Sequence, residues 1–336
     1  MSTKPRPSRF HFVFTVVFLF ACAATAMGQH EGGVTGGGMI GGSTSRPTTK
    51  PPAVKPKPRT TTTTTKKPTT TTSGTTSTGK PNTGTNSGNR PNTGTSNLAE
   101  SYYQQGEALY NAKKYREALD MYLKATEINP SMASALYRAG WIYNDLEDYE
   151  SAVQPLLRTV QLQPNNAAAQ FELGYAYKKL ERYTEALAAF QQCVRAKSDY
   201  AAAHYEIGWI NNDLKNYDAA VLSLRKAMQY RDNYPEAHNE LGYAFRNLGR
   251  YQEAIQEYQE AIRLKPDMAL AHLGLGDVYY YNTKQYAEAM KAYKEGVRLR
   301  PNSPAALYNL GWCYNDLERY AEAVQTLRDP IKLKPE

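Results

Sequence analysis

Small or apolar side chains recur along residues 99–336 with a period of about 34 residues. In each period they occupy positions 4, 7, 8, 11 and 14, which fall on one side of a helix with 3.6 residues per turn. In the second period these positions hold Leu136, Ala139, Gly140, Tyr143 and Leu146. A second helix is expected from about position 15 to position 28. The pattern therefore predicts a chain of paired amphipathic helices, each of which must bury its apolar stripe against a neighbour.

Fixed residues mark the period. Glycine occupies position 8 of every repeat, at 106, 140, 174, 208, 242, 276 and 311, with five spacings of 34 and one of 35. Alanine at position 20, tyrosine at position 17 and proline at position 32 recur in most repeats. This pattern closely resembles the tetratricopeptide repeat, with seven copies at 99–132, 133–166, 167–200, 201–234, 235–268, 269–303 and 304–336. The resemblance implies an all-α fold: a right-handed superhelical solenoid of antiparallel helix pairs.

Some repeats depart from the pattern. The sixth repeat has one additional residue near Asn282–Gln285, where we expect a longer turn. Pro155 lies deep in a predicted second helix and should kink it, and Pro330 should shorten the last helix. No further helix follows the seventh repeat in this sequence, so an apolar face is expected to be uncovered and to permit self-association. That face would hold Val324, Leu327, Ile331 and Leu333.

The first 28 residues have the order of a secretory signal peptide. Basic residues up to Arg9 precede the apolar run Phe12–Ala21, and small residues follow around Ala26. The expected location is therefore secreted or periplasmic. An uncleaved anchor is the alternative, although the apolar stretch is shorter than the roughly 20 residues that span a bilayer. A lipoprotein-type cleavage before Cys22 ranks third, because Phe20 is bulky for that pattern.

Residues 29–98 are rich in Thr, Pro and Gly, with scattered basic residues. Such a segment has too few apolar side chains to offset the entropy of ordering, so we expect a disordered, partly extended linker. The net charge of +8 is unevenly distributed, because residues 1–98 carry +11 and residues 99–336 carry −3. A basic linker is compatible with weak contact with an anionic surface. The repeats themselves have no basic excess that would favour nucleic acid.

The face of each first helix opposite the apolar stripe carries unexpected aromatic residues. Position 9 reads Glu107, Trp141, Tyr175, Trp209, Tyr243, Asp277 and Trp312, and position 5 includes Tyr137, Phe171, Tyr205 and Tyr308. Positions 12 and 13 add polar and charged groups, namely Asn144, Asp145, Lys178, Lys179, Asn212, Asp213, Arg246, Asn315 and Asp316. By resemblance, these positions line the concave groove in which tetratricopeptide repeats bind partners. Aromatic anchors beside directional polar groups are typical of binding hot spots.

Two interpretations of these rings remain open: they bind a partner, or they only pack on neighbouring repeats. For an extended peptide, each repeat would meet roughly three ligand residues. Lys178, Lys179 and Arg246 would then suit an acidic residue or a terminal carboxylate.

The sequence offers no constellation typical of an enzyme, and we expect no catalytic residue, metal site or cofactor. His204, His238 and His272 share position 4, but equivalent positions lie about 10 Å apart, which is too far for one metal ion. Cys193 and Cys313 are about four repeats apart and are expected to be small buried residues. The expected function is a non-enzymatic scaffold that binds a protein or peptide segment. The alternative is a cell-wall or glycan-binding module, because aromatic rings also stack on sugars.

Overall fold

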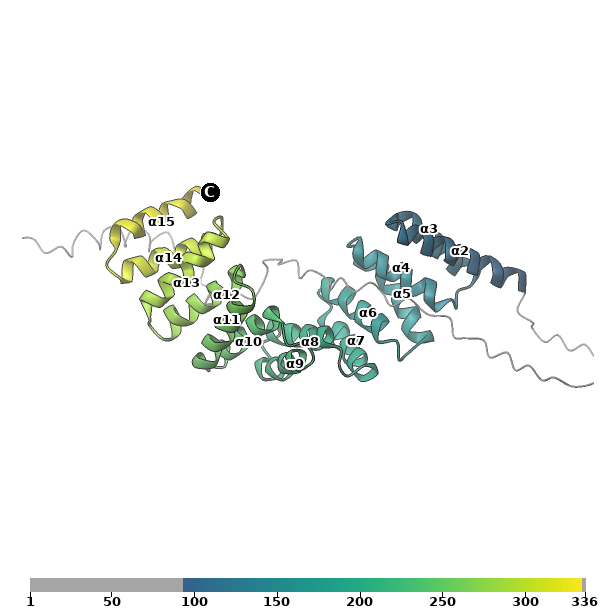
Figure 1. Ribbon diagram of the computed structural model, residues 1–336, viewed down its shortest axis with the longest axis horizontal. Coiled ribbons are helices and arrows are strands. Elements are labelled where there is room, and N and C mark those ends of the chain that lie inside the picture. Colours follow the sequence, from purple (N-terminus) through teal and green to yellow (C-terminus); the bar gives the residue numbers. More distant parts are fainter. Residues whose placement is uncertain (1–92, 334–336) are drawn as a thin grey trace, which may run out of the picture. The chain divides into compact units, whose positions relative to one another are not determined.

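The computed structural model describes residues 93–333, with side chains for residues 96–328. In this part of the chain every regular element is helical (Figure 1). The first helices of the repeats are α2 (Thr93–Asn111), α4 (Ala133–Asp145), α6 (Ala167–Lys179), α8 (Ala201–Asp213), α10 (Pro235–Asn247), α12 (Ala269–Asp277) with the π-helix η1 (Val278–Asn282), and α14 (Pro304–Asp316). The second helices are α3 (Tyr115–Ile128), α5 (Tyr149–Leu162), α7 (Tyr183–Ala196), α9 (Tyr217–Tyr230), α11 (Tyr251–Leu264), α13 (Tyr286–Leu299) and α15 (Tyr320–Leu333).

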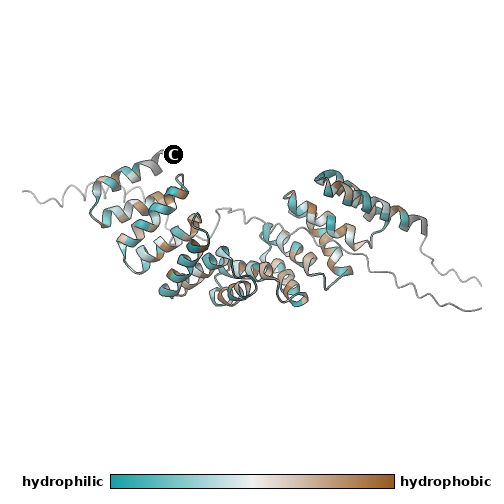
Figure 2. Cartoon of the chain, in the orientation of Figure 1, coloured by the Kyte–Doolittle hydropathy of each residue, from teal (hydrophilic) through white to brown (hydrophobic). Residues whose placement is uncertain are grey.

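The fold class is the predicted one. Each first helix packs on the second helix of its own repeat, and each second helix packs on the first helix of the next repeat (Figure 1). Hydrophobic and hydrophilic residues lie on the same helices (Figure 2), as stacked amphipathic elements require. The predicted signal peptide 1–28 and the linker up to residue 92 lie outside the described residues. Within 93–333 no helix has the length and apolar character needed to cross a bilayer.

The turns within the repeats share one left-handed residue, and all but that of the sixth repeat also share two capping hydrogen bonds. One residue adopts a left-handed backbone with φ between 58° and 74°, and in six of the seven turns it is not glycine. In the second repeat this residue is Glu147, whose N–H donates to the carbonyl oxygen of Asn144 at 3.1 Å. The next amide, Asp148 N–H, donates to the carbonyl oxygen of Tyr143 at 2.9 Å. These two bonds form a Schellman motif, which satisfies the last carbonyl groups of the first helix and reverses the chain.

The glycine at position 8 is explained by a close approach between the two helices of a repeat. A Cβ atom on Gly174 would lie 2.8 Å from two ring atoms of Phe190, which is fully buried at position 24. Corresponding contacts with a large side chain of the second helix recur at the other position-8 glycines. The tight seam between the two helices of a repeat therefore explains why glycine recurs at position 8.

The additional residue of the sixth repeat does not lengthen the turn, so that prediction was wrong. The turn keeps its left-handed residue at Lys284 and its cap at Gln285, as in the other repeats. The residue is taken up inside the first helix, which continues from α12 into η1. A π-helical turn accommodates one residue more than an α-turn without breaking the helix, and such turns occur frequently at functional sites.

Two further expectations about helix ends need correction. Helix α2 begins at Thr93, so residues 93–98, assigned to the linker, are helical. Helix α15 runs through Pro330 to Leu333, so Pro330 does not shorten it. Helix α5 also continues through Pro155 to Leu162, and the kink expected there stays a prediction. The reason is that packing rather than local propensity supplies most of the stability of a helix in a folded protein.

One side of the last described helix is uncovered, as expected. Val324 is 53% exposed, whereas its equivalents Val153 and Val221 are buried by the first helix of the following repeat. Leu327 is half-buried, and the side chains of Ile331 and Leu333 lie outside those that the structure describes.

Candidate binding surface

The candidate site is the surface formed by positions 2, 5, 6, 9, 12 and 13 of the seven first helices, which we call the first-helix surface. Its central feature is a row of aromatic rings at position 9. Trp209 lies edge-on to Tyr183 with centroids 6.2 Å apart. Tyr243 and Tyr217 repeat this contact at 6.2 Å, as do Tyr175 and Tyr149 at 6.1 Å. In the third, fourth and fifth repeats the ring at position 9 therefore rests against the tyrosine at position 17 of the preceding repeat.

The three indoles are neither enclosed nor fully exposed. Trp141, Trp209 and Trp312 are each half-buried. Trp141 lies edge-on to Tyr110 at 5.5 Å, and Trp312 lies edge-on to Tyr308 at 5.9 Å. Part of each indole therefore stiffens the array, and part remains accessible.

Position 5 does not form the expected open aromatic wall. Phe171 and Tyr205 are only 4% and 5% exposed. Phe171 stacks on Tyr200 at 5.1 Å, and Tyr205 packs on Tyr234 at 5.0 Å. Tyr137 is half-buried, so only Tyr308, at 50%, is exposed. The position-5 rings of the third and fourth repeats are core residues, because the tyrosine at the end of the same repeat covers them.

Position 12 forms a polar ladder between repeats rather than a set of outward-facing groups. Asn144 Nδ2 donates to the backbone oxygen of Glu172 at 3.0 Å and to its Oε2 at 2.9 Å. Asn212 Nδ2 makes the same two bonds to Glu240, at 2.9 and 3.0 Å. Both asparagines are only 3% exposed. The ladder joins position 12 of one repeat to position 6 of the next, so these residues hold neighbouring repeats in register.

Lys178 is the charged member of this ladder. Its Nζ lies 2.6 Å from Glu206 Oε2, and both side chains are 7% exposed. The same ammonium lies 3.8 Å from the ring centroid of Trp209. Lys178 is therefore not available to an acidic ligand group, which corrects the role expected from the sequence. The ion pair and the cation–π contact together fix the indole that the next repeat presents.

Position 13 supplies the exposed charges. Asp145, Lys179, Asp213 and Asp316 are all exposed. Lys179 Nζ lies 5.6 Å from the ring centroid of Tyr175. Asp316 accepts a hydrogen bond from Tyr280 Oη at 2.7 Å, and Asn315, half-buried, donates to Asp316 at 3.4 Å. Of the three cations expected to meet an acidic ligand, only Lys179 is exposed.

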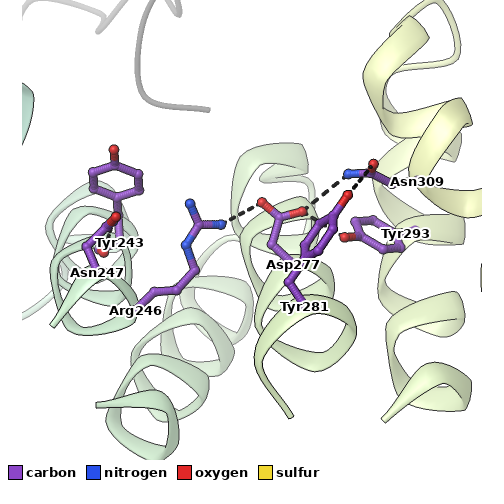
Figure 3. Close-up of polar contacts among 7 residues, drawn as sticks. All are labelled: Tyr243, Arg246, Asn247, Asp277, Tyr281, Tyr293 and Asn309. Carbon is purple, nitrogen blue, oxygen red and sulfur yellow. Dashed lines mark hydrogen bonds and ion pairs between the residues drawn. The ribbon is translucent and has the colours of Figure 1, made fainter. Parts of the chain in front are cut away.

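The fifth, sixth and seventh repeats meet at Asp277 (Figure 3). Arg246 Nη1 pairs with Asp277 Oδ2 at 2.6 Å, and Tyr293 Oη donates to Oδ1 at 2.7 Å. Asn309 Nδ2 approaches the same Oδ1 at 3.4 Å, while Asn309 Oδ1 accepts a bond from Tyr281 Oη at 3.1 Å. Arg246, at position 12, cannot make the ladder contact with position 6 of the next repeat, because that position is Gly274 and offers no side-chain acceptor. It pairs instead with Asp277, at position 9 of the sixth repeat. Arg246 is thus also engaged within the array.

The first repeat contains a related cluster. Glu107, also at position 9, accepts a bond from Tyr122 Oη at 2.6 Å and one from Arg138 Nη2 at 2.7 Å. Burial and the neighbouring carboxylate raise the pKa of Tyr122 and of Tyr293, so both phenols remain donors. Along position 9, the aromatic residues of repeats two to five therefore lie between Glu107 of the first repeat and Asp277 of the sixth, and each of these carboxylates is paired with an arginine.

Comparison with protein families agrees with this arrangement. A family model described as tetratricopeptide repeat matches residues 103–167, 171–238 and 273–335, which is more than half of the chain, and one described as TPR repeat matches 242–282. The chain belongs to the tetratricopeptide repeat family. A comparison with curated protein sequences gives no match.

Solved tetratricopeptide structures share the fold at low sequence identity. The C-terminal part of a TPR repeat-containing protein from Cytophaga hutchinsonii is 16% identical and gives a TM-score of 0.57, with 69% of this chain and 95% of that chain covered. PilF of Pseudomonas aeruginosa is 19% identical with a TM-score of 0.54, covering 60% and 92%. YrrB, described as a TPR protein with an unusual peptide-binding site, is 23% identical with a TM-score of 0.49, covering 55% and 95%. At these identities the likeness concerns the fold.

The remaining candidate residues have structural partners within the tetratricopeptide array. His204 Nε2 lies 2.9 Å from the Ser198 oxygen, His272 Nε2 lies 3.0 Å from the Pro266 oxygen, and His238 pairs with Glu257 at 2.6 Å. Cys193 and Cys313 are buried, as expected, and burial raises the pKa of each thiol to about 12. Among residues 96–328 no three His, Cys, Asp or Glu side chains are grouped closely enough to hold a metal ion.

Glu240 is the ladder residue with a perturbed acidity. Burial raises its pKa above the ordinary glutamate value, and the bond from Asn212 opposes this shift only in part. A carboxyl group whose pKa is raised on folding stabilises the protein below its ordinary pKa, and that contribution is lost as the pH rises through the raised value. We therefore expect Glu240→Gln to gain stability relative to the wild type as the pH rises from about 4 to 7.

Urea unfolding at several pH values measures this difference. Gln keeps an acceptor for Asn212, so only the charge is removed. Glu236→Gln, in the same helix but paired with Lys265 at 3.4 Å, is the matched control. Parallel pH profiles for Glu240→Gln and the wild type would contradict the prediction.

Proposed function

We propose that this protein is a non-enzymatic scaffold that holds an extended segment of a protein partner against the first-helix surface. Tetratricopeptide arrays typically mediate protein–protein interactions, which agrees with the coarse form of this proposal. The observation that carries the finer form is the set of half-buried rings at position 9, where folding of a single repeat requires no aromatic side chain: Trp141, Trp209, Tyr243 and Trp312. Tyr175, expected to line the same surface, is only 8% exposed and belongs to the core. Half-buried Trp and Tyr rings present a rigid apolar surface with a polar edge, as hot-spot residues do.

The polar ladder supports a binding role by making this surface rigid. Asn144, Lys178 and Asn212 use their donors within the array, so the rings beside them are fixed before a partner arrives. A preorganised surface loses less conformational entropy on binding. Glycan binding receives less support, because stacking on a sugar needs a free ring face and the Lys178 ammonium occupies one face of Trp209.

We further propose that the protein acts outside the cytoplasm, in a secreted or periplasmic location. This rests on the order of charged, apolar and small residues in 1–28 and on the Thr- and Pro-rich linker that follows. Cell fractionation followed by mass spectrometry of the N-terminus tests it: a start near Gln29 on exported protein supports export with cleavage, and recovery of the protein with an intact Met1 from the cytoplasmic fraction contradicts it.

Selection of a random peptide library on the full chain tests the binding role. We expect selected peptides to lose affinity by about 2 kcal/mol, or roughly 30-fold, when Trp209 is replaced by alanine. Leu222→Ala is the control, because Leu222 is 67% exposed on the second helix of the same repeat. Trp209 also packs against two core clusters, so some loss of stability is expected too, and affinities should be measured where circular dichroism shows both variants folded.

Peptides that bind the wild type and Trp209→Ala equally would overturn the proposed surface. Enrichment on purified cell-wall polysaccharide, with no selected peptide, would favour the glycan alternative instead.

A further inference from the structure

The charged residues of the array are distributed unequally between its two sets of helices. The seven first helices carry ten acidic and four basic residues, whereas the seven second helices carry thirteen acidic and twelve basic residues. All fourteen charges of the first helices fall on positions 2, 6, 9, 12 and 13, which belong to the first-helix surface. The first helices therefore carry an excess of six acids (10 − 4), while the second helices are nearly neutral.

Three of the four basic residues pair with acids of the same surface and neutralise them, which leaves seven acids (10 − 3) and Lys179 outside these pairs. These pairs are Arg138 with Glu107, Lys178 with Glu206, and Arg246 with Asp277. Asp145, Asp213 and Asp316 are exposed along position 13. An approaching chain therefore meets carboxylates and aromatic rings, a combination that attracts cationic side chains.

The same chain contains a segment with the matching chemistry. Residues 46–67 hold seven basic residues, five prolines and no acid. In a polyproline-type conformation 22 residues extend over about 70 Å, and proline lowers the entropy lost on binding. Seven first helices packed about 8–10 Å apart extend over roughly 50–60 Å, so the lengths agree. Residues 68–92 can span up to roughly 80 Å, which is enough to reach any repeat.

We propose that the first-helix surface binds a basic, proline-containing extended segment, and that residues 46–67 of the same chain are its resident occupant. This inference rests on the proposed function of the surface. Because the segment is tethered, its effective concentration is on the order of millimolar even if its intrinsic affinity is modest. A partner then has to displace the segment, so the linker raises the affinity that a partner needs in order to bind, in addition to serving as a spacer.

The test uses the full chain and a fluorescent synthetic peptide of residues 46–67. In the linker variant, Arg46, Lys50, Lys55, Lys57, Arg59, Lys66 and Lys67 are all replaced by Gln. If the linker occupies the surface, this variant should bind the free peptide about tenfold more tightly than the wild-type chain does in fluorescence anisotropy. Adding Asp145→Asn, Asp213→Asn and Asp316→Asn should weaken that binding about tenfold, and high salt should do the same.

The matched control replaces three surface acids of the second helices in the same background, of which Glu185 and Glu288 are exposed and Glu322 is half-buried. Glu185→Gln, Glu288→Gln and Glu322→Gln remove the same charge from repeats three, six and seven, and should leave the affinity unchanged. Unchanged circular dichroism and unfolding midpoints in both triple variants show that any loss of affinity does not arise from unfolding.

Several results would overturn the inference. If the linker variant binds the peptide of residues 46–67 and its Gln-substituted form with equal affinity, charge attraction is not the cause of binding and the inference is contradicted. Equal affinities of the wild type and the linker variant exclude an intramolecular occupant. Cross-links from linker lysines to position-13 aspartates of a second copy, rather than within one chain, also contradict it.

These failures are distinguishable from failure of the proposed function. Library peptides that are neutral or acidic, yet sensitive to Trp209→Ala, would leave the binding surface intact and refute only its preference for basic segments.

Discussion

Lys178→Met is expected to lower the free energy of unfolding by about 3–5 kcal/mol, because it leaves the Glu206 carboxylate buried without its cation. Lys178 also covers one face of Trp209, so the indole loses a cation–π contact at the same time. Urea unfolding followed by circular dichroism measures the loss, with the midpoint and slope reported separately in case the array no longer unfolds as a single unit.

A second substitution separates the buried charge from the packing. Lys178→Met combined with Glu206→Gln removes both charges and should restore most of the stability, because replacing a buried ion pair by neutral groups of similar size is often close to neutral. Lys179→Ala is the control, because Lys179 is exposed beside Lys178, and its effect should stay within about 0.5 kcal/mol. A double variant as unstable as Lys178→Met would show that the lost lysine contacts, and not the unpaired carboxylate, explain the effect.

Asp277→Ala should destabilise the protein by about 3 kcal/mol, since it removes the acceptor shared by three repeats. The Arg246 side chain, 15% exposed, loses its counterion, and the fully buried Tyr293 loses the acceptor of its hydroxyl group. Asp277→Asn should be milder, because the amide oxygen still accepts from Tyr293 while only the charge is lost. Thermal and urea unfolding of the two variants give the comparison.

Glu288→Ala provides the reference for Asp277→Ala. It removes a carboxylate from the same repeat whose partner, Lys291, is largely exposed, and its effect should be below about 0.5 kcal/mol. If Asp277→Ala is as mild as Glu288→Ala, the cluster in Figure 3 does not hold the last three repeats together.

The candidate site was only partly predictable from the sequence. Helix periodicity placed Trp141, Trp209 and Trp312 away from the seam within each repeat, and the structure leaves them half-buried there. Periodicity describes one helix at a time, however. It gave no reason to expect that Tyr183 would rest against Trp209, or that Tyr200 would cover Phe171, because those contacts depend on how successive repeats are stacked.

The ladder residues show the same limit. Lys178 was expected to face a ligand because position 12 lies opposite the apolar stripe of its own helix. In the array it meets Glu206 of the next repeat, 28 residues away. A signal was present in the sequence: Asn or Lys at position 12 is followed by Glu at position 6 of the next repeat in three successive cases. Such a spacing identifies contact partners only when the packing of neighbouring repeats is known.

By itself the sequence determined the number of repeats, the order of their helices and the tight seam between Gly174 and Phe190, because these follow from local periodicity and side-chain volume. The tertiary structure alone decided that the additional residue of the sixth repeat forms a π-turn, and which charges are paired within the array. The physical reason is that helix pairing is set by residues close in the chain, whereas burial and ion pairing depend on the stacking of surfaces from different repeats.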